Sequence, residues 1–108
     1  MEAAQLVGEC LDAGYGFDGA VALGDRVALG VVNALKERGV AVGTDVRVIG
    51  MDDSIYSRIS SPAISTVRRN TGQLAKKGVE ALLAGKEPAQ THVVVPHEVI
   101  ERATTLGA

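Results

Sequence analysis

The chain has 108 residues, of which 46% are hydrophobic and only 3% are aromatic. This length is typical of one domain or a piece of a larger one, and the aliphatic composition favours buried parallel strands covered by helices. A formal net charge of −2 gives no basic footprint for nucleic acid, and no apolar run approaches the ~20 residues that cross a bilayer. The polar, acidic start is unlike a signal peptide, so we expect a cytoplasmic protein that does not bind membranes.

The first half of the chain predicts two helices and two strands in alternation. Residues 2–14 place apolar side chains at helical spacing, and residues 17–24 form a short apolar run of strand length. An apolar stripe over residues 27–35 predicts a second helix, with Gly39 where a left-handed cap belongs. Residues 46–51 predict a second buried strand. Because strand–helix–strand crossovers are right-handed, the two strands should run parallel.

The second half predicts further strands and one helix. Residues 52–63 read as a loop or a short irregular turn, and residues 64–68 as a third strand. Helix propensity returns over residues 71–85, and two short β segments are expected at 91–96 and 98–102. These elements predict an α/β fold with a Rossmann-like parallel sheet flanked by helices.

Carboxylates follow both strands of the first half, where parallel α/β sheets bind their ligands. Asp25 comes after the first strand, and Asp52 and Asp53 come after the second. If the two strands are neighbours, they lie about 5 Å apart, so their terminal side chains can converge on one ligand. Carboxylates suit hydroxyl donors, which favours a polyol or sugar, with a purine as the alternative.

Structural roles compete with ligand binding at each of these acids. Asp25 immediately precedes a helix and is a favoured N-cap residue. Asp52 precedes no regular helix, so capping explains it less well. We expect Asp53 to tie the loop to backbone amides. The lone Cys10 is expected to be a buried small apolar residue.

Metal and catalytic chemistry are poorly supported by the sequence. His92 and His97 are separated by an apolar run and a proline, without ligands at metal spacing. There is no G-x-S-x-G motif, and residues 16–24 lack the ending of a phosphate-binding loop. We therefore expect a protein that is not an enzyme and needs no cofactor.

Five segments, in order, resemble the C-terminal part of the lactose/galactose repressor (LacI/GalR) family of bacterial transcription regulators. The matching segments are "ALGDRVALG" (22–30), "VRVIGMDD" (46–53), "PAISTV" (62–67), "LAKKGVEALL" (74–83) and "VIERATT" (99–105). The resemblance implies part of a type I periplasmic-binding-protein-like domain, which has two Rossmann-like subdomains with the effector in the cleft. Residues 1–108 would be a partial effector-binding and dimerisation domain that lacks the helix-turn-helix headpiece. Residues 2–67 would belong to the C-terminal subdomain, and residues 68–108 would supply the crossover helix and the terminal strands.

The resemblance also implies roles for residues at the matching motif positions. Asp52 matches the family's effector-contacting acid, and Asp25 matches the family's Asp and keeps its capping role. Gly24 replaces the family's Asn, which removes an amide contact, and Met51 replaces an aromatic residue under the ligand. Arg69 stands where the family often has Gln; a guanidinium there would suit an anionic group such as a sugar phosphate or acid, although a solvated arginine is the alternative.

Family members dimerise through the C-terminal subdomain, which implies an interface on the second predicted helix and the loop that follows the second strand. Exposed apolar residues in a loop often mark an interface, although here they could also cover the strand ends. The candidate interface residues are Val27, Val31, Ala34, Ile55, Tyr56 and Ile59.

The resemblance predicts an effector-binding and dimerisation fragment of a LacI-type regulator. Its partners would be a sugar, a sugar derivative or a purine, a second copy of itself, and operator DNA through a headpiece outside this sequence. One alternative is a fragment of a periplasmic sugar-binding protein of the same fold. Another is a small α/β enzyme that uses Asp25 and Asp52.

Overall fold

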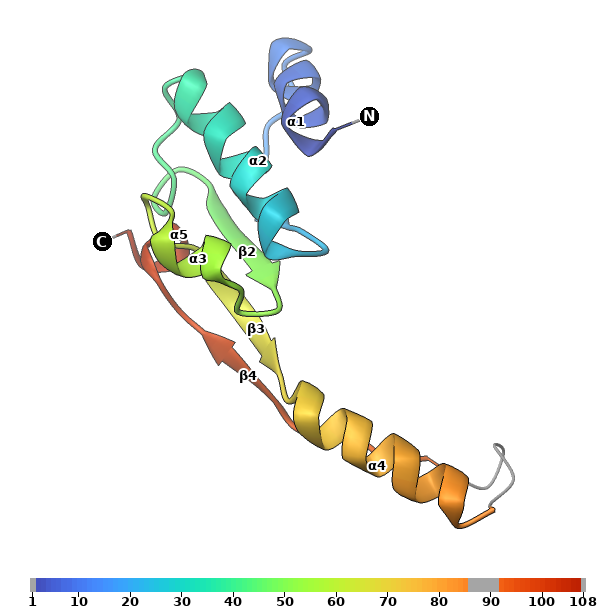
Figure 1. The fold of residues 1–108 in the computed structure, drawn as a ribbon. Helices are drawn as coiled ribbons and strands as arrows, with labels where there is room; N and C mark the ends of the chain where they lie inside the picture. The colour runs from blue at the N-terminus through green and yellow to red at the C-terminus, as the bar shows by residue number, and fades with distance from the viewer. Residues whose placement is uncertain (1, 86–91, 108) are drawn as a thin grey trace.

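A four-stranded sheet in the order β1-β2-β3-β4 forms the centre of the computed structural model, which describes residues 2–85 and 92–107 (Figure 1). The parallel part of the sheet has β1 at its edge, pairing with β2, which pairs in turn with β3. β4 pairs antiparallel with β3. The strand bounds are β1 Gly19–Val21, β2 Arg47–Met51, β3 Ser65–Arg69 and β4 His97–Ile100. The predicted parallel pairing of the first two strands is therefore confirmed.

Five helices accompany the sheet in the described part of the chain. Helices α1, α2 and α4 were predicted from apolar spacing and are confirmed, whereas α3 and α5 were not predicted. The bounds are α1 Ala3–Asp12, α2 Asp25–Glu37, α3 Ile55–Ile59, α4 Thr71–Leu83 and α5 Ala103–Leu106. None of the helices in residues 2–85 and 92–107 is long and apolar enough to cross a membrane.

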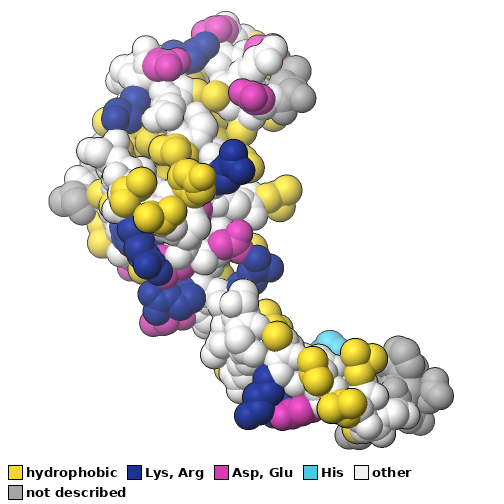
Figure 2. Space-filling view, in the orientation of Figure 1, with side chains coloured by type: hydrophobic (Ala, Val, Ile, Leu, Met, Phe, Trp, Pro, Cys, Tyr) yellow, Lys and Arg dark blue, Asp and Glu magenta, His cyan; other side chains and the backbone are white. Residues whose placement is uncertain are grey.

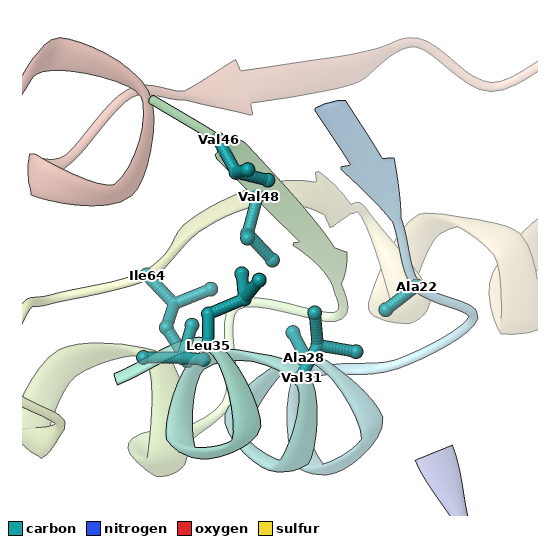
Figure 3. Close-up of a cluster of buried hydrophobic side chains, with 8 residues drawn as sticks. Ala22, Ala28, Val31, Leu35, Val46, Val48 and Ile64 are labelled. Atoms are coloured by element: carbon teal, nitrogen blue, oxygen red, sulfur yellow. The ribbon is translucent and has the colours of Figure 1, made fainter. Parts of the chain in front are cut away.

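The core lies between α2 and one face of the sheet (Figure 3). The apolar stripe of α2 points at β2, so that Leu35 is fully buried near Val48 and Ile64. Burial of each such side chain contributes about 1.5–3 kcal/mol relative to leaving it exposed. The helix ends as predicted, because Gly39 adopts a φ of +73° and its N–H donates to the Lys36 carbonyl.

The opposite face of the sheet is open. Side chains alternate along a strand, so Val21 and Val99 point away from α2, and they are 86% and 57% exposed. Helix α4 projects away from the sheet, which gives the molecule extents of 54 × 27 × 18 Å (Figure 1). Its apolar face is exposed as well, with Leu82 at 82% and Leu83 at 83%.

Three local predictions were wrong. The segment 52–63 is not only a loop, because it contains α3, whose single turn is too short to show helical periodicity in the sequence. Residues 92–96 form no strand, although His97–Ile100 pairs as part of the second expected β segment; residue 91 lies outside the described residues. Cys10 is half-buried, since α1 packs on α2 at the edge of the molecule.

Candidate functional site

Three predicted site residues lie together at the carboxyl ends of the parallel strands. Asp52 directly follows β2, and its Oδ1 forms an ion pair with Nη2 of Arg69, the last residue of β3. The two side chains are 45% and 49% exposed, so both are accessible from solvent. A Cβ added to Gly24, which follows β1, would lie 3.9 Å from Asp52 Oδ2. Parallel pairing of β1, β2 and β3 brings these groups to one edge of the sheet.

Two open hollows adjoin Arg69 at this edge. One has a volume of about 390 Å³ and a mainly apolar lining of Met51, Val67, Arg69, Asn70, Leu74, Val95 and His97. The other has a volume of about 560 Å³ and a polar lining of Arg68, Arg69, Asn70, Thr71, Gly72, Pro96, His97 and Glu98. In residues 2–85 and 92–107, no three His, Cys, Asp or Glu side chains are grouped to hold a metal ion. The hollows offer apolar surface, a guanidinium and a carboxylate to a small ligand.

The turn after β2 is backbone-strained. Asp52 and Asp53 have φ values of +104° and +50°, a region that non-glycine residues adopt at a cost of about 1–3 kcal/mol each. Hydrogen bonds hold the turn: Asp52 N–H donates to the Val67 carbonyl over 2.9 Å, and Asp53 N–H donates to Thr66 Oγ1 over 3.2 Å. The strained turn therefore fixes the direction in which the Asp52 side chain leaves the sheet.

Asp25 does not lie at this accessible edge. Asp25 is 2% exposed, and both of its carboxylate oxygens accept hydrogen bonds inside the protein. Oδ1 accepts from Thr66 Oγ1 over 2.7 Å, and Oδ2 accepts from the Ser54 N–H over 2.6 Å. The predicted capping role is wrong, because Gly24 is the N-cap of α2 and Asp25 is its first helical residue. Burial also leaves the Asp25 carboxylate without a free face for an effector.

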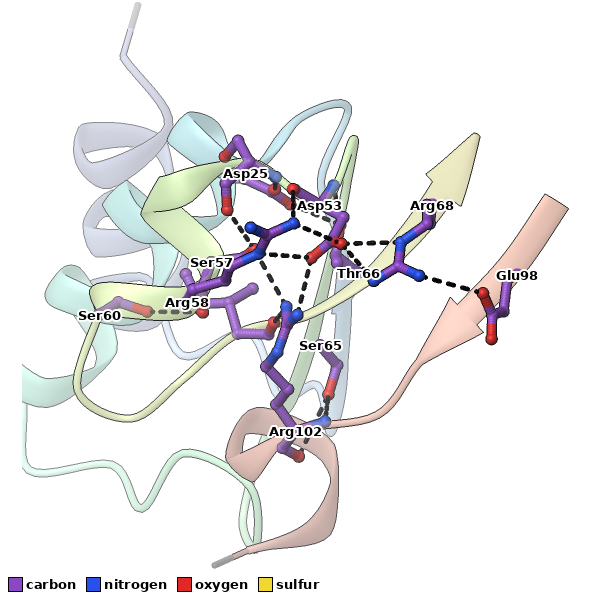
Figure 4. Close-up of polar contacts among 12 residues, drawn as sticks. Asp25, Asp53, Ser57, Arg58, Ser60, Ser65, Thr66, Arg68, Glu98 and Arg102 are labelled. Atoms are coloured by element: carbon purple, nitrogen blue, oxygen red, sulfur yellow. Dashed lines mark hydrogen bonds and ion pairs between the residues drawn. The ribbon is translucent and has the colours of Figure 1, made fainter. Parts of the chain in front are cut away.

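Asp53 is the centre of a buried ionic group (Figure 4). Its side chain is 2% exposed and contacts guanidiniums from three elements: Arg58 of α3 at 2.9 Å, Arg68 of β3 at 2.8 Å, and Arg102 before α5 at 2.7 Å. Arg68 also reaches Glu98 of β4 at 3.4 Å. We call these five residues the Asp53 cluster. The prediction that Asp53 ties the loop to backbone amides is wrong, because its carboxylate binds arginines.

The ion pairs of this cluster strongly lower the pKa of the Asp53 carboxyl. The hydrogen bond from Arg58, supported by those from Arg102 and Arg68, holds the pKa of the Asp53 carboxyl well below its usual range, although burial acts in the opposite direction. Arg102 is itself fixed by donation to Ser57 Oγ and to the Ile64 carbonyl. Asp53 therefore stays ionised and links α3, β3 and the segment that leads into α5.

The arginines of the Asp53 cluster were missed by the sequence analysis. Arg58, Arg68 and Arg102 lie 5, 15 and 49 residues after Asp53, so no helical or strand period connects them. The only local signal was the pair of adjacent acids, Asp52 and Asp53. A carboxylate needs cationic or hydrogen-bonding partners when it is buried, so burial of either acid implies such neighbours.

The predicted interface residues divide into two groups. Val31 and Ala34 are 5% and 2% exposed, so the prediction that they face a partner is wrong; they point into the protein from the inner side of α2. Val27 of α2 and three residues of α3 are exposed, and Figure 2 shows hydrophobic side chains gathered over these helices. The exposed fractions are Val27 41%, Ile55 63%, Tyr56 38% and Ile59 70%. We call these four residues the α2–α3 patch.

Comparison with known proteins identifies the class of this domain. Residues 3–105 match the family described as periplasmic binding protein-like domain, and the chain belongs to that family. The relatives and solved structures that it resembles include LacI-family transcriptional regulators.

The matches cover most of this chain but a minor part of each relative. The HTH-type transcriptional regulator RegA of Clostridium saccharobutylicum is 37% identical over 93 residues, which are 83% of this chain and 28% of RegA. The structure of the lac repressor dimer bound to operator and the anti-inducer ONPF has a TM-score of 0.83 at 28% identity, covering 96% of this chain and 32% of that one. A LacI family regulator from Arthrobacter sp. FB24 in complex with lactose has a TM-score of 0.80 at 28% identity, covering 95% and 40%.

Proposed function

We propose that this chain forms part of the effector-binding domain of a LacI/GalR-type transcriptional regulator. The observation that carries the proposal is the Asp52–Arg69 ion pair at the carboxyl ends of β2 and β3, beside two open hollows. Ligands of open α/β sheets bind at this edge. The lactose complex of the Arthrobacter relative supports a sugar or a similar small polar ligand, with a purine as an alternative.

The chemistry of the edge suits hydroxyl groups on an apolar ring. The Asp52 carboxylate accepts hydroxyl donors, and the guanidinium of Arg69 donates to ligand oxygens. Met51 and Leu74 line the adjoining hollow and offer apolar contact to the C–H face of a ring. Gly24 leaves space beside Asp52, since it carries no side chain. We assign contact with the effector to these residues and not to the buried Asp25.

A second part of the proposal concerns DNA binding and dimerisation by the intact regulator. The chain spans about a quarter of the length of the curated relatives it matches, so DNA binding would need a further domain. The solved lac repressor is a dimer bound to operator. We propose that this regulator likewise works as a cytoplasmic homodimer, with the α2–α3 patch at its interface and no catalytic role. Ligand binding would then shift the populations of two domain arrangements according to its differential affinity for them.

Titration of the ¹⁵N-labelled 108-residue chain by NMR tests the ligand site. D-galactose, D-glucose, lactose and hypoxanthine are added at millimolar concentrations, and Asp52→Asn is compared with Asp18→Asn, an exposed acid away from this edge. We expect one probe to shift the amides of Met51, Asp52 and Arg69, with the shifts lost in Asp52→Asn and kept in Asp18→Asn. Absence of shifts for every probe, or equal shifts in both variants, would refute the site.

A further inference from the structure

The proposed ligand edge carries more positive than negative charge. The hollow with the polar lining is bordered by two guanidiniums, those of Arg68 and Arg69, and by one carboxylate, that of Glu98. The whole chain has a formal net charge of −2, so this local excess of one positive charge runs against the average. The backbone of His97 pairs with Arg69, which places an imidazole beside the same hollows. A ligand with one negative charge would neutralise the edge.

The Asp52–Arg69 pair is accessible to a ligand and, within the described part of the chain, leaves N–H donors of Arg69 free to bind it. Both side chains are about half exposed, and an ion pair of that exposure contributes only about 0–1 kcal/mol. Arg69 has five N–H donors, and in the described residues its side chain donates only through Nη2 to Asp52 Oδ1. A neutral sugar can use the Asp52 carboxylate, but it leaves the excess positive charge of Arg69 and its neighbours uncompensated.

We infer that the effector is a small hydroxy acid, in which a carboxylate lies next to a hydroxyl-bearing carbon, as in a sugar acid; this inference rests on the proposed ligand-binding function. The ligand carboxylate would accept two parallel N–H bonds from Arg69, the pairing that a guanidinium favours. Its neighbouring hydroxyl would donate to Asp52.

The short separation between the Arg69 guanidinium and the Asp52 carboxylate determines how far apart the ligand's carboxylate and hydroxyl must be. Arg69 Nη2 and Asp52 Oδ1 are in direct contact, so the anionic group and the hydroxyl that they bind must stand on adjacent atoms of the ligand. An α-hydroxycarboxylate has that arrangement. In a hexose 6-phosphate, the anionic group is separated from the ring hydroxyls by an extra carbon and the ester oxygen. The first turn of α4, at Thr71 and Gly72, lines the hollow beyond Arg69 and adds its positive helix end.

NMR titration of the 108-residue chain at constant ionic strength tests the inference with four sodium-matched probes: D-gluconate, D-glucose, D-glucose 6-phosphate and acetate. We expect gluconate to bind at least about tenfold more tightly than glucose, and acetate to bind weakly because it has no hydroxyl. Arg69→Gln should reduce gluconate binding to the level of glucose, and Arg69→Lys should retain part of the preference. Arg47→Gln, which changes an exposed arginine at the start of β2, should have no effect.

Each result other than these has a defined meaning. If glucose binds as tightly as gluconate and Arg69→Gln changes nothing, the hydroxy-acid inference is overturned and the ligand-binding function stands. Tighter binding of glucose 6-phosphate or acetate than of gluconate also overturns it, because the adjacent hydroxyl then contributes nothing. If no probe shifts the amides near Asp52 and the sugar and purine titrations fail too, both the inference and the proposed function are wrong.

Discussion

Thr66 and Asp25 lie 41 residues apart in the sequence and are joined by a buried hydrogen bond of 2.7 Å from Thr66 Oγ1 to Asp25 Oδ1. The same hydroxyl oxygen accepts the N–H of Asp53 over 3.2 Å, so it connects the start of α2 to the strained turn after β2. Asp25 therefore affects the proposed ligand site indirectly, because it binds the Thr66 hydroxyl that holds the turn carrying Asp52.

A double-mutant cycle at Asp25 and Thr66 tests this connection. Thr66→Val leaves the Asp25 oxygen and the Asp53 N–H without a buried partner, and we expect a loss of about 1–3 kcal/mol in the free energy of unfolding. Asp25→Ala should cost a similar amount, and the double variant should lose at least about 0.5 kcal/mol less than the sum. Urea unfolding measures all three, with Thr71→Val at an exposed position as a neutral control. Additive losses would show that the two side chains act independently.

Asp53→Asn is expected to be the most destabilising single change of an acid in this domain. The substitution leaves three guanidiniums around a neutral amide in a buried position, and removing one partner of such a group costs about 3 kcal/mol, with some reduction because Arg58 and Arg68 are half exposed. Asp18→Asn, at an exposed acid, should change stability by less than about 0.5 kcal/mol. Chemical denaturation of both variants at neutral pH checks the difference, and equal stabilities would contradict a stabilising role for the Asp53 cluster.

The same acid predicts how stability depends on pH. Because the arginines lower the pKa of Asp53 in the folded state, the unfolded chain binds this proton first as the pH falls. The contribution of Asp53 is therefore fully present above the ordinary aspartate pKa of about 4 and is lost as the pH falls below it. We expect the stability gap between wild type and Asp53→Asn to narrow between pH 5 and pH 3, both values being about one unit from that pKa. Urea midpoints across this range measure the gap, and a gap of constant size would exclude Asp53 as the titrating group.

The parts of the fold that could be predicted from sequence are those with local periodicity. The stripe from Val27 to Leu35 predicted α2, and the apolar run at 46–51 predicted β2, because each repeats at the spacing of its own element. The strand ends also predicted that Asp25 and Asp52 would converge on one ligand, but only Asp52 is accessible there, because Asp25 is buried against Thr66 and Ser54. By contrast, α3 has only five residues, which is too few to show a period.

The roles of the acids could not be predicted to the same degree. Asp25 and Asp53 look like any acids beside a strand end, and their burial depends on the partners Thr66 and Arg102, which follow in distant parts of the chain. Sequence patterns show which residues share an element but not which elements share a polar interior. Val31 and Ala34 were assigned to a dimer interface from the family resemblance, whereas both are buried on the inner side of α2.

Close packing at Gly50 gives a test of the interior near Asp25. A Cβ added to Gly50 would lie 2.5 Å from Asp25 Oδ1 and 3.1 Å from the Ala28 Cβ, so Gly50→Ala forces the helix away from β2. We expect a loss of about 1–3 kcal/mol, as is usual for overpacking. Gly19→Ala is the matched control, since its Cβ would lie 3.9 Å from the Arg47 carbonyl oxygen and fit without displacement. Thermal unfolding of both variants decides the point, and equal melting temperatures would show that the Asp25 side chain can move aside.

The α2–α3 patch predicts where copies of the chain associate. Ile59 is 70% exposed at the end of α3, and Val21 is 86% exposed on the open face of the sheet. These two residues therefore mark two exposed apolar surfaces that a second copy of the chain is able to cover. If the patch forms the proposed dimer interface, Ile59→Asp buries a charge there and should raise the dimer dissociation constant at least about tenfold, whereas Val21→Asp should leave it nearly unchanged. Sedimentation velocity over a range of concentrations separates the two surfaces. Dissociation by Val21→Asp with no effect of Ile59→Asp would move the interface to the open sheet face, because a charge weakens association only where the partner covers it.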